Sequence, residues 1–169
     1  MTTALLIARL LLGGALFAHG AQKLFGWFGG YGIKGTGGFM ETIGFRPGAL
    51  FAAAAGLGEV GGGLLTALGL GGPIGPALII MVMIVAILSV HAPKGFWASN
   101  GGYELNTMNI AAALILAFVG FGGFSLDAAF GLSNVWSDDA RWVVVGAAIV
   151  LALGNMAVRR TSQSTQTTA

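Results

Sequence analysis

The sequence predicts an all-α integral membrane protein: a compact four-helix transmembrane bundle with an additional C-terminal transmembrane helix. Three observations lead to this prediction. Hydrophobic residues make up 56% of the chain, charged residues make up only 8%, and the mean hydropathy is +0.85. This composition is typical of a chain that is embedded in a lipid bilayer. The net charge of +2 leaves no basic face, so we expect no nucleic-acid partner.

Five apolar segments have about the length that a helix needs to cross a bilayer. They are expected at residues 3–24, 49–70, 74–91, 108–124 and 142–158. The last segment is short, so a four-span arrangement in which it lies peripherally stays open. We therefore divide the chain into a membrane domain at 1–127, a loop and fifth helix at 128–160, and a polar, disordered tail at 161–169.

Glycine and proline mark the connections. The sequence GGPIGP, residues 71–76, predicts a tight turn between the second and third spans, because glycine ends helices and proline fits the first helical turn. In the longer connection before the second span, FMETIGF at 39–45 predicts a short interfacial helix. Ala54, Gly58 and Gly62 recur every four residues, which predicts close packing against a neighbouring helix.

The distribution of Lys and Arg favours an outer N-terminus and an inner C-terminus if there are five spans. In that arrangement the cytoplasmic side receives Lys23, Lys34, Arg46, Lys94, Arg159 and Arg160, while Arg141, Asp127, Asp138 and Asp139 fall outside.

The chain has no cysteine, so it has no thiolate for a metal, an iron–sulfur cluster or thiol catalysis. Redox chemistry here would need a bound cofactor or a partner protein.

Two charged residues, Arg9 and Glu59, lie within predicted spans, where an unpaired charge costs about 2.5 to 3.5 kcal/mol or more. Helix rise places them roughly 6 Å apart in depth in a core about 30 Å thick, so we expect a structural ion pair between them. The pair either fixes helix register or serves a function. On this basis Glu59→Gln should weaken folding or ligand retention more than Lys23→Gln.

Arg9, His19 and Lys23 share one helix face, within an arc of about 80°. His19 and Lys23 both lie near the helix end and also have a structural interpretation: Lys23 can extend to the membrane interface, and His19 can cap the last carbonyl groups of the helix. His91 ends the third span at nearly the depth of His19. Two histidines without a further motif give little support for haem, so we do not expect haem on His19 and His91, nor a metal site.

These polar residues predict a cavity for an amphiphile with a polar head, such as a quinone. The candidate binding residues are Arg9, His19, Lys23, Glu59, His91 and Glu104, with Phe25, Trp27, Phe96 and Trp97 as walls. Histidine and carboxylates can supply the protons of quinone reduction, and Lys or Arg can stabilise the developing anion. An aromatic belt at the membrane interface explains the same Trp and Phe residues without a ligand.

Four motifs in order resemble the DoxX family of small bacterial and archaeal membrane proteins. They are HGAQKLFGWFGGYG, GLGEVGGGLLTALGL, HAPKGFWASNGGYEL and GFGGFSLD, within residues 5–127. The resemblance implies a four-helix bundle in a bacterial or archaeal plasma membrane. Its motif residues carry over to Arg9, His19, Gly20, Lys23, Glu59, Glu104, Ser125, Leu126 and Asp127, with His91 in the motif of the third loop. The segment 142–158 extends beyond this pattern.

The resemblance also implies a function, as a subunit of a quinone-linked oxidoreductase of sulfur, thiol or oxidative-stress metabolism. A soluble redox partner would then deliver the electrons. Two other functions stay open: a non-catalytic membrane scaffold that anchors a soluble partner through its loops, and a carrier for a lipid or small molecule. One fold can host several functions, so the choice depends on the site.

Overall fold

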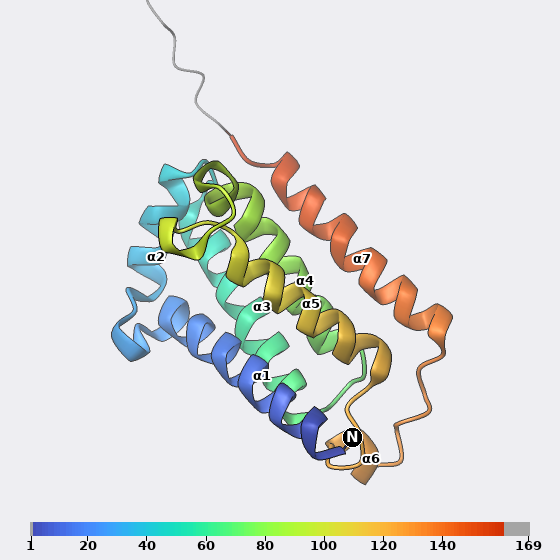
Figure 1. The fold of residues 1–169 in the computed structure, drawn as a ribbon. Helices are drawn as coiled ribbons and strands as arrows, with labels where there is room; N and C mark the ends of the chain where they lie inside the picture. The colour runs from blue at the N-terminus through green and yellow to red at the C-terminus, as the bar shows by residue number, and fades with distance from the viewer. Residues whose placement is uncertain (1, 161–169) are drawn as a thin grey trace, which may run out of the picture.

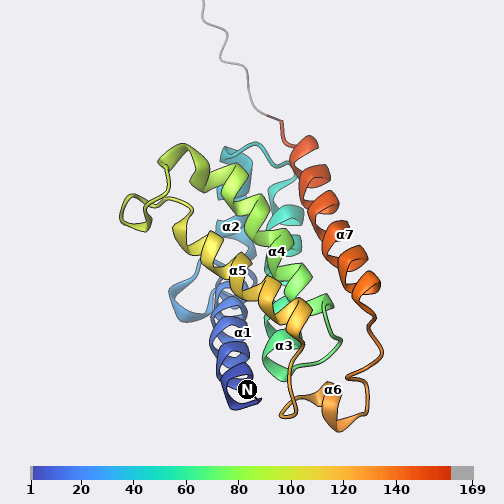
Figure 2. The same cartoon turned by 45° about the vertical axis from the view of Figure 1, so that its right-hand side comes forward.

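The structure, a computed structural model, describes residues 2–160, and within them helices are the only regular secondary structure. Five long helices alternate in direction through the molecule (Figures 1 and 2). They are α1 (Thr2–Phe25), α3 (Gly48–Leu68), α4 (Ile74–Ala86), α5 (Glu104–Val119) and α7 (Asp138–Ala157). The predicted helical membrane bundle with an additional C-terminal helix is confirmed. The predicted disordered tail lies outside the described residues.

Four helical segments in the described part of the chain are long and apolar enough to cross a membrane. They are α1, α3, α7 and the segment Ile74–Lys94, in which α4 continues through a π-helical turn (η2, Ile87–His91) and a 3-10 turn (η3, Ala92–Lys94). With 16 residues, α5 is shorter, about 24 Å at the usual helix rise. The span predicted at 108–124 begins and ends about four residues earlier in the structure, at Glu104 and Val119. The helix ends there because Gly120 takes a positive φ of 84°.

The two ends of the bundle differ. At one end lie α2 (Gly32–Thr42), the 92–103 connection with η4 (Ala98–Asn100), and the last turns of α1 and α7 (Figure 1). We call this the α2 end. The opposite end, the α6 end, holds the start of α1, the turn between α3 and α4, and α6 (Leu126–Ala129). Six of the eight Lys and Arg residues belong to the α2 end: Lys23, Lys34, Arg46, Lys94, Arg159 and Arg160.

Glycines let α1 and α3 pack with their backbones in contact. A Cβ atom on Gly63 would lie 2.6 Å from the Gly13 carbonyl oxygen, and one on Gly20 would lie 2.7 Å from the Gly56 carbonyl oxygen. The opposite side of α3 packs on α4, where a Cβ on Gly62 would lie 3.0 Å from Leu78 Cβ. The predicted close packing of the second span is therefore confirmed, and it involves two neighbouring helices.

The connection before α3 differs from the prediction. Instead of a helix at 39–45, α2 begins at Gly32 and ends at Thr42. The reason is packing: a Cβ on Gly37 would lie 3.0 Å from the Ala49 backbone nitrogen, so α2 is held directly against the start of α3. Tertiary contact thus overrides the poor helix propensity of glycine. The predicted tight turn at 71–76 is confirmed, with Gly69 in the left-handed conformation ending α3 and Pro73 preceding α4.

Candidate functional site

An ion pair between Lys23 and Glu59 joins α1 to α3. The Lys23 ammonium donates to both carboxylate oxygens, at 2.6 Å for Oε1. The Glu59 side chain is 4% exposed and the Lys23 side chain 27% exposed. Helix side chains lean toward their own N-terminus, so in this antiparallel pair both lean toward the level where Gly20 meets Gly56. The register of α1 and α3, set by their glycine contacts, therefore brings the Lys23 ammonium and the Glu59 carboxylate together.

The predicted ion pair between Arg9 and Glu59 was wrong. Gly13 contacts Gly63 and Gly20 contacts Gly56, so Glu59 lies opposite about residue 17 of α1, and Arg9 lies opposite the end of α3. At about 1.5 Å per residue, Arg9 is therefore roughly 12 Å along α1 from the level of Glu59. The estimate from the sequence assumed that both helices ended flush with the membrane surfaces.

Arg9 instead lies buried at the α6 end, with 1% of its surface exposed. Its Nη2 donates to the Phe124 carbonyl oxygen, and its guanidinium carbon lies 5.7 Å from the centroid of the Phe121 ring. The nearby Asp127 carboxylate interacts with it electrostatically. Arg9 thus ties the start of α1 to the segment between α5 and α6 and takes no part in a site at the α2 end.

The Ser-Leu-Asp motif closes the α6 end. The Asp127 carboxylate is buried and accepts the Gly71 and Gly72 backbone N–H groups at 2.9 and 2.8 Å. Ser125 caps α6, accepting the Ala128 N–H at 3.2 Å. These contacts fix the turn between α3 and α4. The sequence motif did not reveal this role, because the amides belong to a turn more than fifty residues away.

A pocket of about 470 Å³ lies at the α2 end, between α1 and α2. Two predicted binding residues, His19 and Lys23, line it. The other lining residues are Gln22, Gly29, Gly30, Tyr31, Gly35, Thr36 and Phe39. The sequence analysis missed Gln22, Tyr31 and Thr36, because their place in the pocket depends on α2 folding back along α1.

Hydrogen bonds order the pocket wall. Gln22 Oε1 lies 3.2 Å from His19 Nδ1, and Gln22 Nε2 donates to the Phe28 carbonyl oxygen at 3.1 Å. Gln22 thus links the imidazole to the 3-10 turn η1 (Trp27–Gly29). The wall combines a hydrogen-bonded imidazole, an ammonium shared with a buried carboxylate, and the rings of Tyr31 and Phe39. Such a site suits a molecule with polar oxygen atoms on an apolar frame.

His91 and Glu104 hold the 92–103 connection together. His91 Nδ1 lies 2.7 Å from the Gly101 carbonyl oxygen, and Glu104 Oε2 accepts the Ala98 N–H at 2.8 Å. The predicted wall residues Phe25, Trp27, Phe96 and Trp97 are all exposed, with Trp97 at 62%. Their exposure is what an aromatic belt at a membrane interface requires. Within residues 2–160, no group of three or more His, Asp or Glu side chains is placed to hold a metal ion.

Comparisons with known proteins give one family. No curated protein and no solved structure gives a significant match to the chain. The family model described as DoxX matches residues 4–92, just over half of the chain. The match includes α1, α3, α4 and the Lys23–Glu59 pair. It ends at Ala92, the first residue of the 92–103 connection, and does not reach the Ser-Leu-Asp motif. This multi-pass membrane protein belongs to the DoxX family.

Proposed function

We propose that this chain is the membrane subunit of a quinone-linked oxidoreductase system and that its pocket at the α2 end binds a quinone-like amphiphile. The observation that supports this most is the placement of Lys23 and His19 together on the wall of a pocket of about 470 Å³. Both residues can interact with oxygen atoms of a bound head group, and the aromatic rings in the same wall suit its flat, apolar frame.

The residues of the pocket fit such a head group. An ammonium has three N–H donors, and Lys23 uses two of them on Glu59, so one is left for a quinone oxygen. With His19 Nδ1 held by Gln22, Nε2 is the ring atom that can give or take a proton at the pocket. Glu59 keeps the ammonium in place. A positive charge at this position stabilises negative charge that develops on the head group during reduction.

In this proposal the electrons come from outside this chain, because without cysteine it has neither a thiol nor a cysteine-ligated iron–sulfur cluster to supply them. A quinone takes up two electrons and two protons when it is reduced. We infer that a soluble partner oxidises a sulfur compound or thiol by two electrons and passes them on, while the protons enter through His19. The α2 end would then face the cytoplasm, which agrees with the six Lys and Arg residues gathered there.

Mass spectrometry of an organic extract of the purified protein tests this proposal. The protein is extracted from membranes in mild detergent, and quinone, haem and phospholipid are quantified per chain. We expect close to one quinone per chain, and a severalfold loss in His19→Leu. An unrelated membrane protein from the same membranes gives the background. Asn100→Leu, a polar-to-leucine change at an exposed position outside the pocket, is the matched control.

Quinone at background level in the wild-type protein would refute the proposal. So would equal quinone content in the wild type, His19→Leu and Asn100→Leu. His19 is exposed and its side chain is hydrogen-bonded to the neighbouring Gln22 of the same helix, so His19→Leu should fold as the wild type does. A circular dichroism spectrum checks this.

A second candidate function is a scaffold that anchors a soluble partner, and the 92–103 connection favours it. Backbone hydrogen bonds from Tyr103 to Gly95 at 3.1 Å and from Glu104 to Phe96 at 2.8 Å close this segment into a fixed loop. The loop presents Trp97 to its surroundings. If Trp97→Ala abolished co-purification of a soluble protein and quinone was at background, the scaffold would replace the oxidoreductase subunit as the better account.

A further inference from the structure

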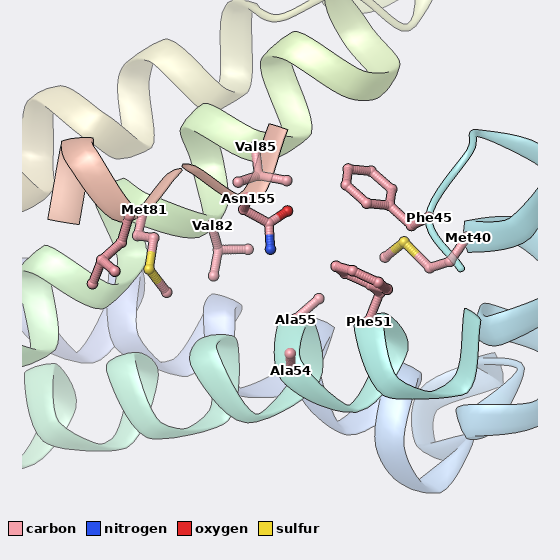
Figure 3. A pocket seen from close by; sticks show the side chains of 10 residues that line it. Met40, Phe45, Phe51, Ala54, Ala55, Met81, Val82, Val85 and Asn155 are labelled. Carbon is pink, nitrogen blue, oxygen red and sulfur yellow. The ribbon is translucent and has the colours of Figure 1, made fainter. Parts of the chain in front are cut away.

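A second cavity, of about 230 Å³, lies at the α2 end on the side of the bundle that α7 covers. Figure 3 shows side chains converging on it from α3, α4, α7 and the segment around α2. Its lining is apolar except for Asn155: Met40, Phe45, Phe51, Ala54, Ala55, Met81, Val82, Val85 and Leu151 supply the rest. This composition and the position beside membrane-spanning helices suit a hydrocarbon chain.

Three arginines lie on or beside the α2–α3 turn that forms one wall of this cavity: Arg46 on the turn itself, and Arg159 and Arg160 after the end of α7. The Arg160 N–H donates to the Gly44 carbonyl oxygen at 2.8 Å, and Arg159 Nε donates to the Ile43 carbonyl oxygen at 2.6 Å. The next residue after Gly44 is Phe45, whose buried ring lines the cavity, and Arg46 follows it. The end of α7 is thereby docked on the turn.

The charges at this rim are mostly free to bind an anion. Arg46 and Arg160 are exposed, whereas Arg159 is occupied by a backbone carbonyl group. The acidic residue nearest in sequence, Glu41, accepts the Gly48 N–H at 3.1 Å at the start of α3. One exposed arginine, Arg46, lies on the turn that walls the apolar cavity, and the other, Arg160, follows α7 and is bonded to that turn through its backbone. Together they give the combination of charge and apolar volume that an anionic lipid needs.

We propose that this cavity holds one acyl chain of an anionic phospholipid, whose phosphate is bound by Arg46 and Arg160. The lipid would bridge α7 to the turn before α3, because α7 contributes Leu151 and Asn155 to the lining and the residues that follow α7 contribute Arg160 to the rim. This site is separate from the pocket lined by His19 and Lys23, so the proposal does not depend on quinone binding.

The charge at the rim decides between a phospholipid and other hydrophobic chains. The isoprenoid tail of a quinone would fill the same apolar volume but would gain nothing from the arginines. An anionic headgroup near a basic residue gains about fivefold in affinity for each arginine, so about 25-fold for the pair. A zwitterionic phospholipid with the same acyl chains should gain much less.

Native mass spectrometry of the full chain tests this. Delipidated protein in detergent receives an equimolar mixture of phosphatidylglycerol and phosphatidylcholine with identical acyl chains. We expect a one-to-one lipid adduct enriched at least tenfold in phosphatidylglycerol. The double variant R46Q/R160Q should reduce the enrichment to about one. K34Q/K94Q removes two exposed charges from the same end without touching this rim, and should keep the enrichment.

A second pair of variants tests the cavity itself. Ala54→Leu fills part of the lining and should weaken phosphatidylglycerol binding severalfold, whereas Ala147→Leu, on an exposed position of α7 outside the lining, should not. Equal binding of both lipids by the wild type would overturn the proposal. It would also be overturned if R46Q/R160Q kept the preference, if Ala54→Leu bound as the wild type does, or if added quinone displaced phosphatidylglycerol from the wild-type protein.

Discussion

Replacing Lys23 by methionine should destabilise the protein more than replacing Glu59 by glutamine. The change Lys23→Met leaves a carboxylate that is 4% exposed without its partner in the bundle. The change Glu59→Gln leaves an ammonium that is 27% exposed, on a flexible chain that can extend toward the membrane surface. This order is opposite to the one expected from the sequence, where Arg9 was assigned as the partner of Glu59.

The magnitude follows from the burial of the two groups. Removing one partner of a buried ion pair costs about 3–5 kcal/mol. Since Lys23 is partly exposed, we expect the free energy of unfolding to fall by about 3 kcal/mol in Lys23→Met and by about 1 kcal/mol in Glu59→Gln. The double variant should lose only about 2 kcal/mol, which gives a coupling energy of about 2 kcal/mol. For a chain of this length these losses correspond to decreases in Tm of about 6–12 °C and 2–4 °C for the two single variants.

Thermal unfolding of the wild type, both single variants and the double variant in the same detergent measures this. Lys94→Gln, which removes an exposed Lys side chain at the same end, is the control and should leave Tm unchanged. If Glu59→Gln lowered Tm as much as Lys23→Met, or if the two effects were additive in the double variant, the two groups would not form the buried pair described here.

Two further predictions concern packing and the α6 end. Gly63→Ala should lower the free energy of unfolding by about 2–3 kcal/mol, because its Cβ would lie 2.6 Å from the Gly13 carbonyl oxygen. Gly146→Ala should raise the free energy of unfolding by about 0.5–1 kcal/mol, because a Cβ there meets nothing within 4 Å. Equal Tm values for these two variants would contradict the close contact of α1 and α3. Asp127→Asn should cost about 1.5–3 kcal/mol by weakening charge-assisted bonds to the α3–α4 turn, and should speed proteolysis there. Asp139→Asn, an exposed control, should do neither.

The helices themselves could be predicted because apolar runs of this length have one stable form in lipid. The tight turn before α4 could be predicted from Gly71 to Pro76, because the backbone preferences of glycine and proline are local. The extent of α2 could not be predicted, because it depends on Gly37 approaching the start of α3 closely enough to offset glycine's poor helix propensity. Local preference and tertiary contact oppose each other in this segment.

The candidate site was predictable in part. The presence of His19 and Lys23 on one face of α1 follows from helix periodicity, and both line the pocket. The partner of Glu59 depends on how far α1 and α3 are shifted along each other. The Gly13–Gly63 contact fixes that shift, and nothing in one helix alone reveals it. The places of Tyr31 and Thr36 depend likewise on α2 folding back.

Photoaffinity labelling with a quinone analogue tests the central proposal most directly. The full-length protein in proteoliposomes is illuminated with a photoreactive quinone, digested and analysed by peptide mass spectrometry. We predict that the label is found in residues 19–39, that excess unlabelled quinone removes it, and that His19→Leu lowers it severalfold. Label spread over the lipid-facing side of α7, unaffected by competitor, would contradict a quinone site between α1 and α2.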